Sequence, residues 1–119
     1  MTTTPTADSA VPRATPSAVV WIDATSAIVA SVEGDGEAST CDITRGSLHE
    51  STYLEQVVHA VGDRRRVMIL GPGAERLALE REYVAVYHRP DRLVDVEPAH
   101  VVDRDELLAL ARTLAGTAR

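Results

Sequence analysis

The most restrictive feature of the sequence is a run of four apolar residues, Val67–Leu70, followed by Gly71, Pro72 and Gly73. Apolar runs of this length, ended by glycine and proline, are typical of a strand that is buried on both faces of a sheet. A chain of 119 residues has room for one hydrophobic core, so the other elements must pack around this strand. The stretch therefore predicts the central strand of a single α/β domain.

The sequence divides into a domain and two short tails. Residues 1–17 consist largely of Thr, Pro, Ser and Ala and offer little to bury, so we expect a disordered N-terminal tail. Residues 18–115 carry the regular apolar patterns of the domain. Residues 116–119 begin with Gly116, a residue type that commonly ends helices, and form the expected C-terminal tail.

Three strand-like segments open the domain. Ala18–Ile22 is almost wholly apolar, which predicts a strand covered on both faces, and Ser26–Val32 is rich in β-branched residues. Glu37–Ile43 mixes charged and small residues, which suits an edge strand. Turns at Asp23–Thr25 and Gly34–Gly36 connect them, so we expect an antiparallel three-stranded meander.

Two helices are predicted from the spacing of a capping box, in which a polar N-cap residue is followed three positions later by an acid. Ser47 and Glu50 have this spacing, and so do Asp103 and Glu106. Apolar residues follow each box at helical intervals: Tyr53, Leu54, Val57, Val58 and Val61 in the first helix, and Leu107, Leu108, Leu110, Ala111 and Leu114 in the last.

The segment Ala74–Tyr87 fits two secondary structures. Residues 83–87 have strand propensity when taken alone, but the apolar residues of the whole segment also fall on adjoining helical stripes. We expect one helix that ends before Pro90, followed by a short strand at Arg92–Glu97. The order strand, strand, strand, helix, strand, helix, strand, helix predicts a mixed five-stranded sheet, antiparallel on one side and parallel on the other.

Composition limits the classes of partner. The net charge is −6 and all 12 basic residues are arginine, which argues against broad binding to nucleic-acid phosphates, so no DNA partner is expected. Aromatic residues amount to 3%, too few for a base-stacking surface. The longest apolar runs are too short to cross a membrane. A single cysteine, Cys41, allows no internal disulfide, so a cytoplasmic location is expected.

Several of these segments together resemble a known family. The opening strand ending in Val20–Asp23, the meander, the segment Ile69–Gly73 and the final helix containing Glu106 and Leu107 are similar to a small family of bacterial translational machinery proteins. That family is similar to the central domain of archaeo-eukaryotic peptide-chain release factors and of Pelota. The resemblance extends over about residues 19–114 and implies an RNase H-like fold and a role in translation.

The sequence also departs from the pattern of that family. Ala24 follows Asp23 where a histidine is usual, and Arg76 stands where release factors commonly have a lysine. Release factors carry a catalytic Gly-Gly-Gln motif between the third strand and the first helix, whereas this chain has Arg45–Leu48 there and its only glutamine is Gln56. The resemblance therefore implies a protein without peptidyl-tRNA hydrolase activity and without catalytic residues.

Two groups of residues have both a functional and a structural interpretation. The Gly71–Gly73 turn before a helix could bind an anion, but without a full phosphate-loop pattern a plain turn is the better interpretation. Arg64, Arg65 and Arg66 could contact RNA phosphate, whereas such runs are more often solvated loops, here able to pair with Asp63. Arg45 and Arg76 complete the set of candidate RNA-contact residues.

No metal or cofactor site is predicted. The four histidines do not share a ligand spacing on one helix, and Cys41 stands alone. Asp23, Glu50 and Glu97 could form a carboxylate cluster of the RNase H type, but Asp23 is better explained as a turn residue.

Two functions of different class remain. The first is a non-catalytic, translation-associated protein that contacts the ribosome or tRNA through its local arginines. The second is a small module that binds another protein or a second copy of itself, using its helical faces and the Glu37–Ile43 edge.

Overall fold

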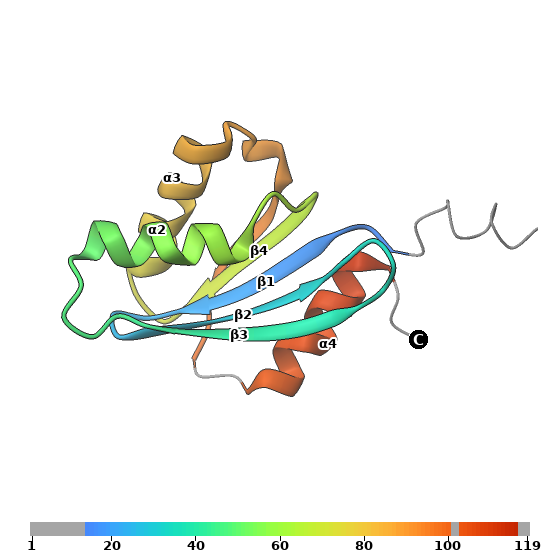
Figure 1. Cartoon of the computed structure of the whole chain (residues 1–119), viewed down its shortest axis with the longest axis horizontal. Coiled ribbons are helices and arrows are strands. Elements are labelled where there is room, and N and C mark those ends of the chain that lie inside the picture. Colours follow the sequence, from blue (N-terminus) through green and yellow to red (C-terminus); the bar gives the residue numbers. More distant parts are fainter. Residues whose placement is uncertain (1–13, 101–102, 117–119) are drawn as a thin grey trace, which may run out of the picture.

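The computed structural model describes residues 14–100 and 103–116, and its strands form one mixed sheet in the order β3-β2-β1-β4-β5 (Figure 1). The strands are β1 (Ser17–Ile22), β2 (Ser26–Val32), β3 (Ala38–Thr44), β4 (Arg66–Gly71) and β5 (Leu93–Pro98). The helices within the described residues are α2 (Glu50–Val61), α3 (Glu75–Tyr87), the short 3-10 helix η1 (Pro90–Arg92) and α4 (Arg104–Ala115).

The pairing of the strands confirms the predicted topology. β1 pairs antiparallel with β2, and β2 pairs antiparallel with β3, which gives the meander and places β3 at one edge. On its other side β1 pairs parallel with β4, and β4 pairs parallel with β5. The apolar run that begins at Val67 thus lies inside the sheet, as its composition predicts.

Helices cover both faces of the sheet, with α2 and α3 on one face and α4 on the other (Figure 1). The alternation of side chains along β1 divides the core accordingly. Val20 and Ile22 pack with α2 and α3, whereas Val19 and Trp21 pack with α4. Every residue of β1 is buried, which confirms that this strand is covered on both faces.

The capping box expected at Ser47 and Glu50 is not formed. α2 begins at Glu50 itself, and its N-cap is His49, whose side chain makes no capping hydrogen bond. The residues before it close a tight turn instead, in which the N–H of Leu48 donates to the carbonyl oxygen of Arg45 at 3.0 Å. This turn occupies the positions that would otherwise have formed the first turn of a longer helix.

The ambiguous segment after Gly73 is helical throughout, because α3 runs unbroken to Tyr87. Burial explains why the helix prevails over the strand propensity of residues 83–87. Tyr83 is 1% exposed, and the centroid of its ring lies 4.8 Å from the ring centroid of Tyr87, one helical turn away. His88 then ends the helix in the left-handed conformation, with φ of 56°.

The last helix confirms its predicted ends. Asp103 accepts a hydrogen bond from the amide of Glu106, the carboxylate of Glu106 accepts one from the amide of Asp103, and Gly116 ends α4 in the left-handed conformation. The apolar face differs slightly from the prediction. Leu107 and Ala111 are buried, but Leu110 is 37% exposed.

The domain includes residues on the N-terminal side of the expected boundary at residue 18. The amide of Ala14 donates to the carbonyl oxygen of Gly34 at 3.1 Å, and that of Thr15 donates to Ala115 at 3.0 Å. Ser17 is the first residue of β1. The rest of the expected tails, residues 1–13 and 117–119, lies outside the described residues. No helix within the described ranges is both long and apolar enough to span a membrane.

Candidate functional site

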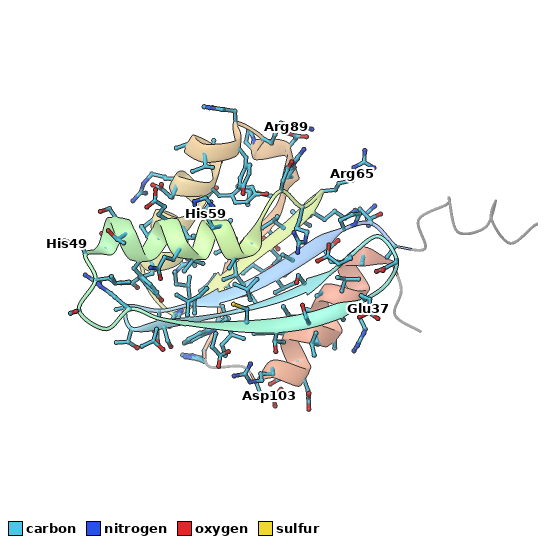
Figure 2. All side chains as sticks on the ribbon, in the orientation of Figure 1. Glu37, His49, His59, Arg65, Arg89 and Asp103 are labelled. Carbon is cyan, nitrogen blue, oxygen red and sulfur yellow. The ribbon has the colours of Figure 1, made fainter. Side chains whose placement is uncertain are left out.

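The candidate arginines lie at opposite ends of the sheet. β1, β3 and β4 run in the same direction, so the loops that follow them meet at one end, which we call the carboxyl end. Arg45 follows β3 and Arg76 follows β4 by a few residues, which places both at this end. Arg64, Arg65 and Arg66 lie where β4 begins, at the amino end. In Figure 2 His49 marks the first end and Arg65 the second.

The arginines of the carboxyl end bind to their own loops. The Nε–H of Arg45 donates to the carbonyl oxygen of Leu48 at 2.9 Å, which closes the β3–α2 turn. Nη1 of Arg76 donates to the carbonyl oxygen of Gly73 at 2.6 Å. Both side chains therefore shape loops as well as carrying charge. Beside Arg45 lies an open hollow of about 640 Å³, lined by Ala24, Thr25, Thr44, Arg45, Gly46, Ser47, Leu48 and His49.

The Gly71–Gly73 turn has a packing explanation. A β-carbon on Gly71 would overlap the carbonyl oxygen of Ile22 in the adjacent strand, so only glycine fits there. The amide of Ala99 donates to the carbonyl oxygen of Gly71 at 2.9 Å, which joins the end of β5 to the same turn. The turn at the end of β4 is therefore in contact with the end of β1 and with the residue that follows β5, just before α3 begins.

A buried tyrosine of α2, Tyr53, contacts the turn after β1 at the carboxyl end of the sheet. The Tyr53 hydroxyl donates to the backbone carbonyl oxygen of Asp23 at 2.9 Å. Burial, followed by the negative charges of Asp23 and Glu75, raises the pKa of Tyr53 well above its usual value, and the positive charge of Arg45 only partly opposes this. Tyr53 is thus a neutral hydrogen-bond donor at every physiological pH.

The carboxylate of Asp23 organises the turn between β1 and β2. Its Oδ1 accepts hydrogen bonds from the amides of Thr25 and Ser26, each at 2.8 Å, and from the Thr25 hydroxyl at 3.0 Å. Partial burial raises the pKa of Asp23, but these three bonds together outweigh burial and hold it below its usual value. The interpretation of Asp23 as a turn residue is confirmed.

At the amino end the three consecutive arginines have different surroundings. Arg64 forms an ion pair with Glu33 at 2.7 Å, and Nη1 of Arg66 donates to the carbonyl oxygen of Leu114 at 2.7 Å. Arg65 is exposed, and its side chain makes no polar contact with the described residues. Of the three, only the Arg65 guanidinium is therefore fully available to a ligand.

The structure adds two arginines that sequence reasoning missed. Arg92 forms an ion pair with Asp63, which joins η1 to the loop before β4, in place of the pairing expected between Asp63 and the arginine run. Arg89 forms a two-pronged pair with Asp91 at 3.0 and 2.8 Å, and it projects near the Arg65 end of the molecule (Figure 2). The whole of α3 separates Arg89 from the arginine run in sequence, so only the fold brings them to the same end.

The comparisons with known proteins agree with this architecture. No protein-family model matches the sequence, and no curated protein sequence matches it significantly. Among solved structures, the Pelota protein of Thermoplasma acidophilum matches 84% of this chain with a TM-score of 0.60 and 23% identity. Pelota of Archaeoglobus fulgidus, a structure described as revealing inter-domain structural plasticity, matches 92% of this chain with a TM-score of 0.63 and 16% identity.

The chain has the fold of a Pelota domain. It spans about a third of each Pelota protein, 32% and 34% respectively, so the likeness concerns one domain of a larger molecule. The Pelota-like fold accounts for the mixed sheet and for the placement of helices on both faces. It confirms the α/β class and the predicted likeness to the central domain of Pelota.

The polar groups at the two ends of the sheet are arginine side chains and the backbone groups of the turns. In the Pelota-like fold of this chain, the loop between β3 and α2 contains Arg45 and ends at His49, whereas the only glutamine, Gln56, is exposed on α2. Within the described residues, no three His, Cys, Asp or Glu side chains gather into a metal-binding group. Guanidinium groups and turn amides of this kind can bind phosphate and carbonyl oxygen.

Proposed function

We propose that this protein is a non-catalytic, translation-associated domain of the release-factor and Pelota type, which contacts ribosomal RNA or tRNA in the cytoplasm. The observation that carries the proposal is the likeness to two Pelota structures over 84% and 92% of the chain. The resemblance to bacterial translational machinery proteins points to the same process.

The composition of the β3–α2 loop supports a role without catalysis. In release factors this loop is expected to carry the glutamine of the Gly-Gly-Gln motif. Here the loop is a short connection held by the Arg45–Leu48 hydrogen bonds. Gln56 lies well inside α2, where it cannot take the place of a loop residue. The domain would therefore bind its partner without hydrolysing peptidyl-tRNA.

The surface that best suits RNA phosphate is the amino end of β4 together with the loop before η1. The guanidinium of Arg65 has no polar partner among the described residues. The guanidinium of Arg66 donates to one carbonyl oxygen and keeps further N–H groups that can bind a ligand. Arg89 lies in the segment that the Arg92–Asp63 ion pair joins to this surface. Glu33, in the β2–β3 hairpin, pairs with Arg64 and so offsets the charge of that arginine.

Cosedimentation with ribosomes, at low and at moderate salt, tests this proposal. We expect the wild-type protein to pellet with ribosomes at low salt and to do so less at moderate salt, because phosphate contacts release counterions. The variant Arg65→Glu should pellet several-fold less. Arg81→Glu is the matched control, since Arg81 is an exposed arginine on α3, a different part of the surface.

Three results would count against the proposal or one of its parts. A folded wild-type protein that does not pellet at either salt concentration removes the ribosome as partner, and tRNA is then tested by gel shift. Absence of tRNA binding as well leaves the interaction-module hypothesis. If Arg65→Glu and Arg81→Glu reduce cosedimentation equally, binding depends on the total charge of the protein and the Arg65 surface has no special role in it.

A further inference from the structure

β3 is an open edge of the sheet with a regular and self-complementary pattern. It pairs with β2 over all seven of its residues, from Ala38 to Thr44, without a bulge. Within the described residues it is the terminal strand of the sheet, so its outer hydrogen-bonding groups have no strand partner. Regular, open edges of this kind are the places where a second strand adds to a sheet.

The hydrogen bonds at the two ends of the β2–β3 ladder show which groups face outward. The amide of Glu33 donates to the carbonyl oxygen of Glu37, and the amide of Arg45 donates to that of Thr25, both at 2.9 Å. In an antiparallel ladder, hydrogen-bonded pairs alternate with pairs that are not bonded. Counting along the register, the odd-numbered residues of β3 bond to β2. The residues that direct their N–H and C=O groups to the open edge are therefore Ala38, Thr40, Asp42 and Thr44.

This pattern is symmetric about Cys41, the middle residue of the strand. When a second copy of β3 lies antiparallel with its own Cys41 opposite, Thr40 faces Asp42 of the second copy and Ala38 faces its Thr44. All four outward-facing residues then find partners. A pairing centred on Asp42 would place two carboxylates opposite each other, and one centred on Thr40 would leave Thr44 outside the ladder.

When two copies pair antiparallel about Cys41, the charged side chains on the α4 side of β3 in one copy are complementary to those of the other copy. Arg104, in the first turn of α4, forms an ion pair with Asp42 and donates from Nη1 to the Thr40 hydroxyl at 3.2 Å. Because Thr40 would face Asp42 of the second copy, each Arg104 would lie between two carboxylates, one from each copy. Two arginines and two aspartates would thus alternate across the symmetry axis.

The opposite edge of the sheet does not have these properties. The pairing of β5 with β4 shifts register between Val67 and Met68. Asp95 and Glu97 lie two positions apart on β5, and their interaction raises the pKa of Glu97, as expected for neighbouring like charges. Irregular pairing and like charges are the usual protection of an edge strand against self-association. β3 has neither along its length.

We infer that the β3 edge is a homodimerisation surface, at which two copies of this chain pair antiparallel about Cys41 to join their sheets into one continuous sheet. Edge pairing alone buries little surface, so the dimer is weak and forms at high protein concentration. This pairing uses neither Arg65 nor Arg89, and it therefore does not depend on the proposed contact with RNA.

Disulfide trapping tests the register directly. Cys41 would form a non-hydrogen-bonded pair across the axis, in which α-carbons are about 4.5 Å apart, a distance that a disulfide can span. Diamide, which takes up the two electrons and two protons that the thiols release, serves as the oxidant. The control is the double variant Ser39→Cys with Cys41→Ser, because residue 39 is also exposed but would face Ile43 of the second copy.

We expect the wild-type protein to form the disulfide-linked dimer about tenfold faster than this control, because only Cys41 meets its own copy within disulfide reach. Adding Ser39→Cys and Ile43→Cys together, again with Cys41→Ser, should restore rapid cross-linking. Equal rates for the wild type and for the Ser39→Cys control would indicate random collision and would overturn the inference.

A proline variant tests the pairing without a thiol. Thr40 directs its amide outward, so Thr40→Pro removes a donor of the dimer without removing one from the β2–β3 ladder. Under reducing conditions, sedimentation equilibrium should show self-association of the wild type and of Thr40→Val, and its loss in Thr40→Pro. Circular dichroism shows whether Thr40→Pro is folded; if it is not, the cross-linking comparison decides. A wild-type protein that stays monomeric at its highest soluble concentration would also overturn the inference.

Discussion

The α-carbon of Gly71 faces the carbonyl oxygen of Ile22 so closely that no β-carbon fits between the ends of β4 and β1. This contact lies where the central parallel pair of strands stops, next to the Asp23 turn and below the start of α3. Gly73, two residues further along, has a different environment: a β-carbon there would meet only the side-chain oxygen of Glu75, which can move. The two glycines of one turn thus have unequal roles.

Gly71→Ala is therefore expected to destabilise the domain by about 1–3 kcal/mol, the usual cost of inserting a methyl group into a well-packed region. A change of this size lowers the midpoint of thermal unfolding by several degrees or more in a domain of about 100 residues. Gly73→Ala is the matched control and should change stability by less than about 0.5 kcal/mol. Thermal unfolding of both variants, followed by circular dichroism, checks the difference. Equal destabilisation would contradict the assigned contact.

Much of this fold could be predicted from apolar patterning. The run at Val67–Leu70 and the run at Ala18–Ile22 both predict strands buried on two faces, and these become the adjacent central strands β4 and β1. The two strands pair residues that are far apart in the sequence, but the apolar run that identifies each strand can be recognised from its own few residues. The capping box at Asp103 and Glu106 is likewise local, and the structure confirms it.

The candidate site was harder to predict because its geometry depends on long-range contacts. The sequence at Ser47 and Glu50 fits a capping box, yet Arg45 and Leu48 close a turn first and the helix begins later. Sequence spacing also treats all five candidate arginines alike. Only the direction of the strands separates Arg45 from the Arg64–Arg66 run.

The two capping boxes expected from the sequence, of which only the one at Asp103 and Glu106 is formed, give a second prediction. Asp103→Ala should destabilise the domain by about 1 kcal/mol, because it removes the side-chain oxygen that accepts from the amide of Glu106 at 2.8 Å. Ser47→Ala should have almost no effect, since Ser47 is exposed and does not cap α2. Urea unfolding at pH 7 measures both. A cost for Ser47→Ala equal to that of Asp103→Ala would show that Ser47 does act as an N-cap.

Tyr53 gives a prediction for alkaline pH. Its pKa is raised in the folded protein, chiefly by burial, so the folded state holds the phenolic proton more tightly than the unfolded state. The contribution of this proton to the free energy of unfolding is present in full when the pH is below the ordinary tyrosine pKa near 10. It is lost progressively as the pH rises above that value. The hydrogen bond to the carbonyl oxygen of Asp23 is lost together with the proton.

Tyr53→Phe should therefore lower the free energy of unfolding by about 1 kcal/mol at pH 7, the usual contribution of one hydrogen bond. Above pH 10 the difference from the wild type should shrink and then reverse, because the variant has no phenol to ionise at this position. Urea unfolding at intervals from pH 7 to about pH 11 measures this trend. Tyr87→Phe is the control, since Tyr87 lies at the end of α3 and its hydroxyl has no hydrogen-bond partner among the described residues. A constant difference between Tyr53→Phe and the wild type over the whole range would show that burial does not raise the pKa of this phenol.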